Sequence, residues 1–224
     1  VEAFRILRFS LGYMRHATQV MMTTSTTPGQ GKSFISRNMA AILSMAGKKV
    51  ILVDADIRKG TLSRTFGHTF GLTTYLSDDQ CKVDDIIRVD GLTKGVDFIP
   101  AGHQAPNPAE LLMSKRLEIL VSELRKRYDY VILDTTPLFA VADANVVARV
   151  TDTTLFIIRV GVQTRSFLPT LERNYQDNRF KNMCIVLNDV DPEDPYKSNY
   201  GYGYGYGHHH TSKKGFIKRL RKRR

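Results

Sequence analysis

The stretch QVMMTTSTTPGQGKSFISRNMAAILSMAG, residues 19–47, decides the fold. Its opening residues, 19–24, are mostly apolar or β-branched, which predicts a short buried strand. The proline and glycines at 28–31 favour a turn and end that strand. From Ser33 onward apolar residues recur at helical spacing, and Gly47 is well placed to end the helix. The order is therefore strand, glycine-containing turn and helix.

The next residues, KVILVDAD at 49–56, predict a second strand, because four apolar residues run into carboxylates. Strand, turn, helix and strand in this order make a βαβ unit, which implies a parallel sheet covered on both faces. The pattern repeats more weakly further on. It predicts strands at 95–102, 130–134, 154–160 and 183–188, and helices at 109–128, 142–149 and 166–176. We therefore expect a doubly wound α/β fold of the P-loop NTPase type, with a mostly parallel sheet and helices on both faces.

The periodic spacing of apolar residues ends after Asp189, and the following segment is rich in Pro, Gly, Tyr and charged residues. Such a segment has too little apolar surface to offset the entropy of ordering it. We predict one domain at residues 1–190 and a flexible, tyrosine-rich and basic tail at 191–224.

Composition narrows the function classes. The chain has 224 residues, 42% of them hydrophobic, which fits one globular domain with a real core. An apolar run of membrane-spanning length and an export leader are both missing, which predicts a cytosolic location. Cys81 and Cys184 lie outside any metal-binding spacing and are interpreted as core thiols.

The formal charge of +11 is concentrated at the end of the chain. Residues 213–224 hold eight basic and no acidic side chains, so the rest of the molecule carries only +3. A general polyanion-binding surface is therefore not expected. Three alternatives stand for this basic arm: contact with anionic lipid, with nucleic acid or with an acidic partner.

The turn at 28–31 has the features of a phosphate-binding loop. Backbone N–H groups at the start of a helix attract anions, and its two glycines keep side chains out of the ligand's way. Lys32 and Ser33 match the end of the Gx₄GK[ST] P-loop, in which the lysine reaches the β- and γ-phosphates and the hydroxyl binds Mg²⁺. Thr26 departs from the pattern, since it occupies the place of the first glycine. The alternative is a flexible loop with an exposed lysine, but the flanking strand and helix favour a nucleotide site.

Three aspartates end predicted strands. Asp54 and Asp56 follow one apolar run, and Asp134 follows another. Ligands of open α/β sheets lie beyond the carboxyl ends of the strands, so these acids are expected near the phosphates. Each alone is as readily a helix cap or a turn former. Together with Ser33, one or two of them would satisfy Mg²⁺, which prefers oxygen ligands and keeps several waters, and the remaining acid would orient or deprotonate an incoming hydroxyl.

These motifs resemble those of the bacterial tyrosine kinases, whose catalytic domain is the cytoplasmic part of membrane proteins that control capsule and exopolysaccharide export. The similarity runs from about Glu2 to Asp189. It rests on TTPGQGKS (26–33) as Walker A, ILVDADIRKG (51–60) as Walker A′, VILDTTP (131–137) as Walker B, EAFRILR (2–8) as the ExxRxxR assembly motif, NPAELL (107–112), and the tyrosine-rich end.

Three departures qualify the resemblance. Related partition and cell-division ATPases carry a signature lysine at the position of Thr27, so this residue favours the kinase. Thr136 replaces a proline of the usual Walker B motif, with little expected consequence. A His triplet, which is chance or an expression remnant, and the basic arm follow the tyrosine cluster that commonly closes the chain.

The resemblance implies ATP-dependent phosphorylation of tyrosine, with ATP and Mg²⁺ as cofactors. A phenol with a pKa of about 10 needs a nearby base or a very loose transition state. Asp54 is the leading candidate for that base and is linked to Mg²⁺, while Asp56 and Asp134 hold the metal directly or through water. The roles of Asp54 and Asp56 are exchangeable. Lys32 offsets phosphate charge. Arg58 belongs to the same motif, with a surface ion pair as the alternative. The expected nucleotide contacts are Thr27, Pro28, Gly29, Gln30, Gly31, Lys32, Ser33 and Phe34, and Asn188 contacts adenine or serves a turn.

The tail is expected to be the enzyme's own substrate. Glycine beside each phenol removes steric obstruction and frees the backbone, so a narrow site accepts successive tyrosines. The alternative is a low-complexity aromatic linker. The expected acceptors are Tyr196, Tyr200, Tyr202, Tyr204 and Tyr206.

Glu2, Arg5 and Arg8 lie three apart on one helical face, which alone indicates an intrahelical ion pair. In the family this motif pairs subunits in a ring, so we expect a homo-oligomer in which neighbours phosphorylate each other's tails and which loosens as charge accumulates. Because the chain starts inside the motif, it is expected to be a fragment or one polypeptide of a two-part system.

The resemblance implies further partners at the cytoplasmic face of the bacterial inner membrane. They are a transmembrane co-polymerase or activator region, in the same or a separate chain, and a cognate tyrosine phosphatase. The basic arm at 213–224 either contacts the anionic leaflet or is a solvated charge run. The main alternative function is a nucleotide-switch ATPase without kinase activity; a nucleic-acid-binding role is third, and no specific nucleic acid is expected.

Overall fold

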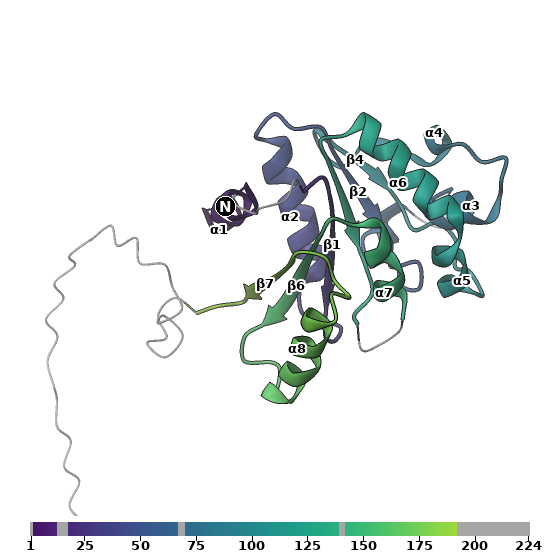
Figure 1. Ribbon diagram of the computed structural model, residues 1–224. Coiled ribbons are helices and arrows are strands. Elements are labelled where there is room, and N and C mark those ends of the chain that lie inside the picture. Colours follow the sequence, from purple (N-terminus) through teal and green to yellow (C-terminus); the bar gives the residue numbers. More distant parts are fainter. Residues whose placement is uncertain (1, 13–17, 67–69, 139–141, 192–224) are drawn as a thin grey trace, which may run out of the picture. The chain divides into compact units, whose positions relative to one another are not determined.

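The computed structural model describes residues 2–12, 18–66, 70–138 and 142–191. Residues up to Val190 belong to one compact unit. In the described part of the chain seven strands form one sheet, in the order β3-β4-β2-β5-β1-β6-β7 (Figure 1). The strands are β1 Val20–Ser25, β2 Val50–Asp54, β3 Arg88–Thr93, β4 Val96–Ile99, β5 Tyr130–Asp134, β6 Thr153–Arg159 and β7 Met183–Asn188.

All neighbouring strands are parallel except β3, which runs antiparallel to β4 at the edge. The expected doubly wound, mostly parallel sheet is therefore confirmed. The α-helices are α1 Glu2–Gly12, α2 Lys32–Ser44, α3 Leu72–Ser77, α4 Val83–Ile86, α5 Pro108–Met113, α6 Lys115–Arg127, α7 Asp143–Val147 and α8 Leu168–Gln176, with short 3₁₀ turns at Ser63–Phe66, Ala148–Val150 and Arg165–Phe167.

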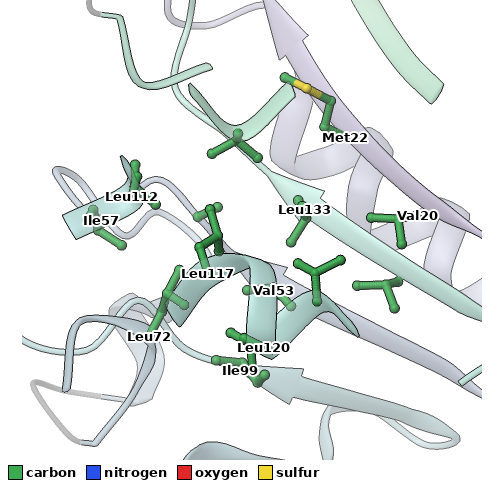
Figure 2. Packing of buried hydrophobic residues seen from close by; sticks show 14 of the residues in the cluster. Val20, Met22, Val53, Ile57, Leu72, Ile99, Leu112, Leu117, Leu120 and Leu133 are labelled. Atoms are coloured by element: carbon green, nitrogen blue, oxygen red, sulfur yellow. The ribbon is translucent and has the colours of Figure 1, made fainter. Parts of the chain in front are cut away.

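The central strands β1, β2 and β5 are buried on both faces, and their side chains alternate between two hydrophobic clusters. In β1, Val20 and Met22 join one cluster, whereas Met21 joins the other. This alternation follows from the period of two in a strand. Helices α5, α6 and α7 pack on the first cluster, and α2 packs on the second. Figure 2 shows Leu112 of α5 and Leu117 and Leu120 of α6 within the first cluster. A strand buried on both faces must be almost wholly apolar, which explains why these runs are legible in the sequence.

The predicted single helix at 109–128 is wrong, because the chain forms two helices, α5 and α6. Ser114 separates them with an extended backbone, φ −63° and ψ 152°. Leu112 and Leu117 are both fully buried. In one continuous helix, five positions apart, they would point about 140° away from each other. The break lets both side chains enter the same cluster.

Strand β3 and the short helices α3 and α4 were not predicted. β3 reads RVDGLT, is only partly buried and contains an irregular register against β4. Its residues lack the apolar alternation of a half-buried strand. Gly95, with φ 81°, closes the tight turn to β4.

Helix α1 lies against α2. Leu11 is buried, and Phe4 and Leu7 pack against the second cluster. Among the described residues, the helices are all too short or too polar to cross a membrane. Cys81 is buried in the first cluster and Cys184 packs partly buried against the second, in keeping with core thiols.

Phe156→Ala is expected to lower the free energy of unfolding by about 3–5 kcal/mol, because the ring is fully buried and leaves a cavity. Urea unfolding followed by circular dichroism measures this change. Phe70→Ala is the matched control, since that ring is 61% exposed, and its effect should stay within about 0.5 kcal/mol. Equal losses in the two variants would contradict the assigned core.

Candidate active site

The loop between β1 and α2 has the backbone of an anion cradle. Gly29 and Gly31 adopt positive φ angles of 82° and 95°, which L side chains rarely do. A Cβ atom on Gly31 would also lie 2.2 Å from Nδ2 of Asn188. Glycine is therefore required at position 31 both by its backbone angle and by its close neighbour. Lys32 then begins α2, and its side chain is largely buried.

One backbone group and two side chains from other segments support this loop. The Gln30 amide oxygen accepts a bond from the Arg159 backbone N–H at 2.7 Å, and its nitrogen donates to Thr27 Oγ1 at 3.1 Å. Gln163 donates to the same Thr27 oxygen at 2.7 Å. Asn188 Nδ2 donates to the Gln30 carbonyl at 2.9 Å. Asn188 thus contacts the loop backbone, and its role toward adenine stays a prediction.

A cavity of about 350 Å³ opens beside the loop. Lys32 and Ser33 line it together with Asp56, so the predicted phosphate and carboxylate groups share one space. Its wall is completed by Pro28, Gly29, Gly31, Phe34, Lys59, Thr61, Arg64 and Pro137.

Asp134 at the end of β5 is fully buried and accepts three hydroxyl bonds. Ser33 Oγ donates to Oδ2 at 2.5 Å, while Thr23 and Ser36 donate to Oδ1 at 2.9 Å each. Burial raises the pKa of this carboxyl, and the nearby Lys32 ammonium and the three hydroxyls oppose the rise. The residue therefore ties the helix that carries the phosphate loop to the centre of the sheet.

Asp54 lies beside Asp134, because the two residues are register partners on β2 and β5. Ser63 fixes one carboxylate oxygen, donating to Oδ2 from its hydroxyl at 2.6 Å and from its backbone N–H at 3.0 Å. The other oxygen, Oδ1, is buried and accepts no bond from the described residues. Burial, reinforced by the neighbouring Asp134 carboxylate, raises the pKa of Asp54 to about 7.

Asp56 is 5% exposed and accepts a bond from the Lys59 backbone N–H at 3.1 Å. Arg58 points toward α7, where it donates from Nε to Asp143 Oδ2 at 2.6 Å and from Nη2 to Oδ1 at 3.1 Å. Asp143 is 1% exposed. Arg58 is thus held in place by a bidentate ion pair, as in the alternative role considered for it, and its catalytic role stays a prediction.

Comparison with known proteins identifies the family to which the chain belongs. A family model described as an AAA domain matches residues 18–168, more than half of the chain. The kinase domain of the Escherichia coli tyrosine kinase ETK superposes with a TM-score of 0.78 at 35% identity, covering 92% of this chain and 80% of that one. The chain belongs to the bacterial tyrosine kinases, within the AAA domain family.

Among the bacterial tyrosine kinases, a relative from Klebsiella pneumoniae named as a tyrosine-protein kinase in the cps region is 39% identical over 194 residues. That alignment covers 85% of this chain and 27% of the relative, so the chain spans about a quarter of the curated relative's length. The fold also extends to the septum site-determining protein MinD of Pyrococcus horikoshii, whose TM-score is 0.64 at 18% identity, covering 79% of this chain and 72% of that one.

The tyrosine-kinase fold implies Mg²⁺, and the oxygen donors present fit it. Within the described ranges there is no group of three or more His, Cys, Asp or Glu arranged to hold a metal. The cation would therefore need the Ser33 hydroxyl and phosphate oxygens as well as protein carboxylates, as Mg²⁺ ordinarily does. Asp134 lies against Ser33, and Asp54 on the next strand keeps an unpartnered oxygen.

The remaining predicted residues lie elsewhere. Glu2, Arg5 and Arg8 are on α1, where Arg5 Nη1 donates to Glu2 Oε2 at 3.2 Å and the Arg8 guanidinium lies 4.9 Å from the Phe9 ring centroid. The tyrosine acceptors Tyr196, Tyr200, Tyr202, Tyr204 and Tyr206, and the basic arm, lie outside the described residues.

Sequence reasoning missed the groups that position the site. Ser63 and Asp143 each bond a predicted residue, and Lys59 and Arg64 line the cavity. Lys59 directly follows Arg58 in the Walker A′ stretch, so this position in the motif could have identified it as a residue of the site. Ser63 and Asp143 are ordinary residues whose partners become neighbours only in the folded chain.

Asp54→Asn is expected to stabilise the metal-free protein increasingly as the pH rises. The folded pKa of about 7 exceeds the ordinary 3.8, so this carboxyl's contribution to stability is full below pH 4, falls between those values and is lost above pH 7. The variant lacks this loss. Its free energy of unfolding should therefore exceed that of the wild type by an amount that grows between pH 4 and pH 7 to the order of 4 kcal/mol. Urea unfolding in EDTA at several pH values measures it.

The exposed Asp78→Asn is the control for loss of one acidic side chain. Parallel pH profiles for wild type and Asp54→Asn would contradict the assigned desolvation of Asp54.

Proposed function

We propose that this chain is an ATP-dependent protein tyrosine kinase domain that phosphorylates its own C-terminal tyrosine cluster. One observation carries the proposal: the Lys32–Ser33 loop opens onto a cavity that Asp56 also lines, and Ser33 is bonded to Asp134, which is the register partner of Asp54 at the ends of two adjacent parallel strands. Phosphoryl transfer needs positioning and charge compensation more than covalent chemistry. A glycine loop, a lysine and strand-end carboxylates supply these features.

The residues divide the task between them. Loop amides and Lys32 bind the phosphates and offset their charge. Bound Mg²⁺, held by Ser33 with Asp134 behind it, would neutralise charge on the β- and γ-phosphate oxygens. The phenol oxygen forms a bond to the γ-phosphorus while the bond to the β-phosphate oxygen breaks, and ADP leaves. The phenol proton passes to a carboxylate, for which Asp54 is first choice and Asp56 the exchangeable alternative.

The nucleotide assignment has support from the fold. The MinD structure of the same fold was solved with Mg-ADP. The loop of this chain keeps both glycines in the left-handed conformation that such a site requires. Thr27 occupies the position of the signature lysine of partition-type ATPases, which favours transfer to tyrosine over a switch function.

The substrate and assembly follow from the tail and from α1. Tyr196, Tyr200, Tyr202, Tyr204 and Tyr206 are the proposed acceptors, and neighbours in a homo-oligomeric ring present them to one another. Tethering in a ring raises the local tail concentration, so little intrinsic affinity is needed. The Klebsiella relative's place in the cps region supports a role in capsule or exopolysaccharide synthesis and export, with a membrane co-polymerase region and a phosphatase as partners.

Incubation with Mg-ATP is expected to add successive phosphate masses to the wild-type chain and none to Lys32→Met. The substitution removes the cation that faces the phosphates, so transfer should fall at least about 100-fold. Intact-mass spectrometry measures this, and peptide mapping locates the sites. Arg173→Met, at an exposed position on α8, is the matched control. ATP hydrolysis without any mass gain would instead identify a nucleotide-switch ATPase.

Glu2→Ala combined with Arg5→Ala and Arg8→Ala is expected to reduce the oligomer and to slow phosphorylation between chains. Their side chains are exposed or half-exposed in the single chain, so folding should survive the change. Light scattering gives the mass, and mixing Lys32→Met with a tail-truncated active chain isolates transfer between molecules. Unchanged size together with unchanged transfer would exclude the ring.

A further inference from the structure

A second cavity, of about 220 Å³, adjoins the cavity beside the phosphate-binding loop, which is called the phosphate cavity below. The second cavity lies beyond the ends of β2 and β4. Lys59 and Arg64 line both cavities, so the two spaces meet along these side chains. Arg58, Ser63 and Ala101 contribute to the wall of the second cavity only. This volume is below the range of small-molecule pockets, so it suits a side group and not a second nucleotide.

The second cavity is fixed relative to the proposed base. Ser63 donates its hydroxyl hydrogen to Asp54 at 2.6 Å, and the same oxygen accepts a bond from the Ala101 N–H at 2.7 Å. One residue therefore connects the cavity wall on the β4 side to the carboxylate at the end of β2. A group bound here would lie beside an acceptor that approaches Asp54.

The lining is cationic. Asp143 neutralises Arg58 through the bidentate pair and holds it at the cavity. The Lys59 and Arg64 side chains form no ion pair or hydrogen bond with the rest of the described chain, and both are exposed. Two positive charges are therefore available to a ligand. A guanidinium and an ammonium side by side favour carboxylate or phosphate oxygens.

We propose that this second cavity is an anion subsite that selects acceptor tyrosines flanked by a negatively charged group. The inference rests on the proposed kinase function and names its substrate class. The shared chemistry has two sources in this chain: the carboxylates of Asp191, Glu193 and Asp194, which precede Tyr196, and the phosphate of a tyrosine already modified within the Tyr-Gly repeat. Either group would be held by Arg64 and Lys59 while the phenol faces Asp54.

The test compares peptides that differ only in charge. DPEDPYKSNYG, residues 191–201, is compared with NPQNPYKSNYG, and YGYGYGY carrying one phosphotyrosine is compared with the same peptide carrying phenylalanine at that position, so that both have three acceptors. The wild-type chain should phosphorylate each anionic peptide with a kcat/KM about tenfold above its neutral counterpart, as expected for one charge-assisted contact. A preference in only one pair identifies carboxylate or phosphate as the source.

Arg64→Gln should lower the ratio of kcat/KM between anionic and neutral peptides to about twofold or less in both pairs. Arg173→Gln, which changes an exposed arginine on α8, should leave both ratios unchanged. If Arg64→Gln lowers all four peptides equally, Arg64 serves the nucleotide and the subsite is refuted. Wild-type ratios near one refute it as well.

Peptide binding in the presence of ADP, followed by fluorescence anisotropy, tests the subsite without phosphoryl transfer. Tighter binding of the anionic peptides that is lost in Arg64→Gln would support the subsite even if the chain transferred no phosphate, in which case only the proposed kinase function fails. Equal binding of anionic and neutral peptides would refute the subsite and leave the kinase function standing.

Discussion

The buried carboxylate of Asp134 is the interaction on which the site depends. A charge in the centre of a sheet is costly unless hydrogen bonds compensate it. Here Thr23 from β1 and Ser33 and Ser36 from α2 provide those bonds. The strand before the phosphate loop and the helix after it are therefore fastened to the same group. The loop cannot shift as a unit without breaking bonds to a buried acid, which fixes Lys32 and the glycine amides in place.

The same burial sets the electrostatics around the loop. Burial raises the pKa of Asp54, and the register-paired Asp134 carboxylate on β5 adds to the rise; Asp54 Oδ1 accepts no bond from the described residues. The positive side chains that line the phosphate cavity are Lys32, which is largely buried, and Lys59 and Arg64, which are exposed and form no ion pair with the described part of the chain. The carboxylates and Lys32 lie deep, whereas Lys59 and Arg64 are exposed, an arrangement suited to an anion that arrives together with a cation.

Six of the seven strands in the described part of the chain and the loop were predictable from the sequence, because apolar parallel strands and a glycine turn leave strong local patterns. The break at Ser114 was missed, since helical periodicity continues across it and only the joint burial of Leu112 and Leu117 requires it. Edge strand β3 was missed because its exposed, Gly-containing sequence carries no alternation. At the site, motif residues were predictable, whereas Ser63 and Asp143 acquire their roles through contacts 9 and 85 residues away along the chain.

Helix α1, which carries the proposed assembly residues, contacts the helix that follows the phosphate-binding loop. The Phe4 ring of α1 meets the Phe34 ring of α2 edge-on, with centroids 5.9 Å apart. Phe34 directly follows Ser33 and lines the phosphate cavity. Aromatic pairs of this geometry contribute about 0.5–1.5 kcal/mol beyond their buried area. In the proposed ring, a movement of α1 imposed by a neighbouring subunit would therefore reach the wall of the cavity beside the phosphate-binding loop through this ring contact.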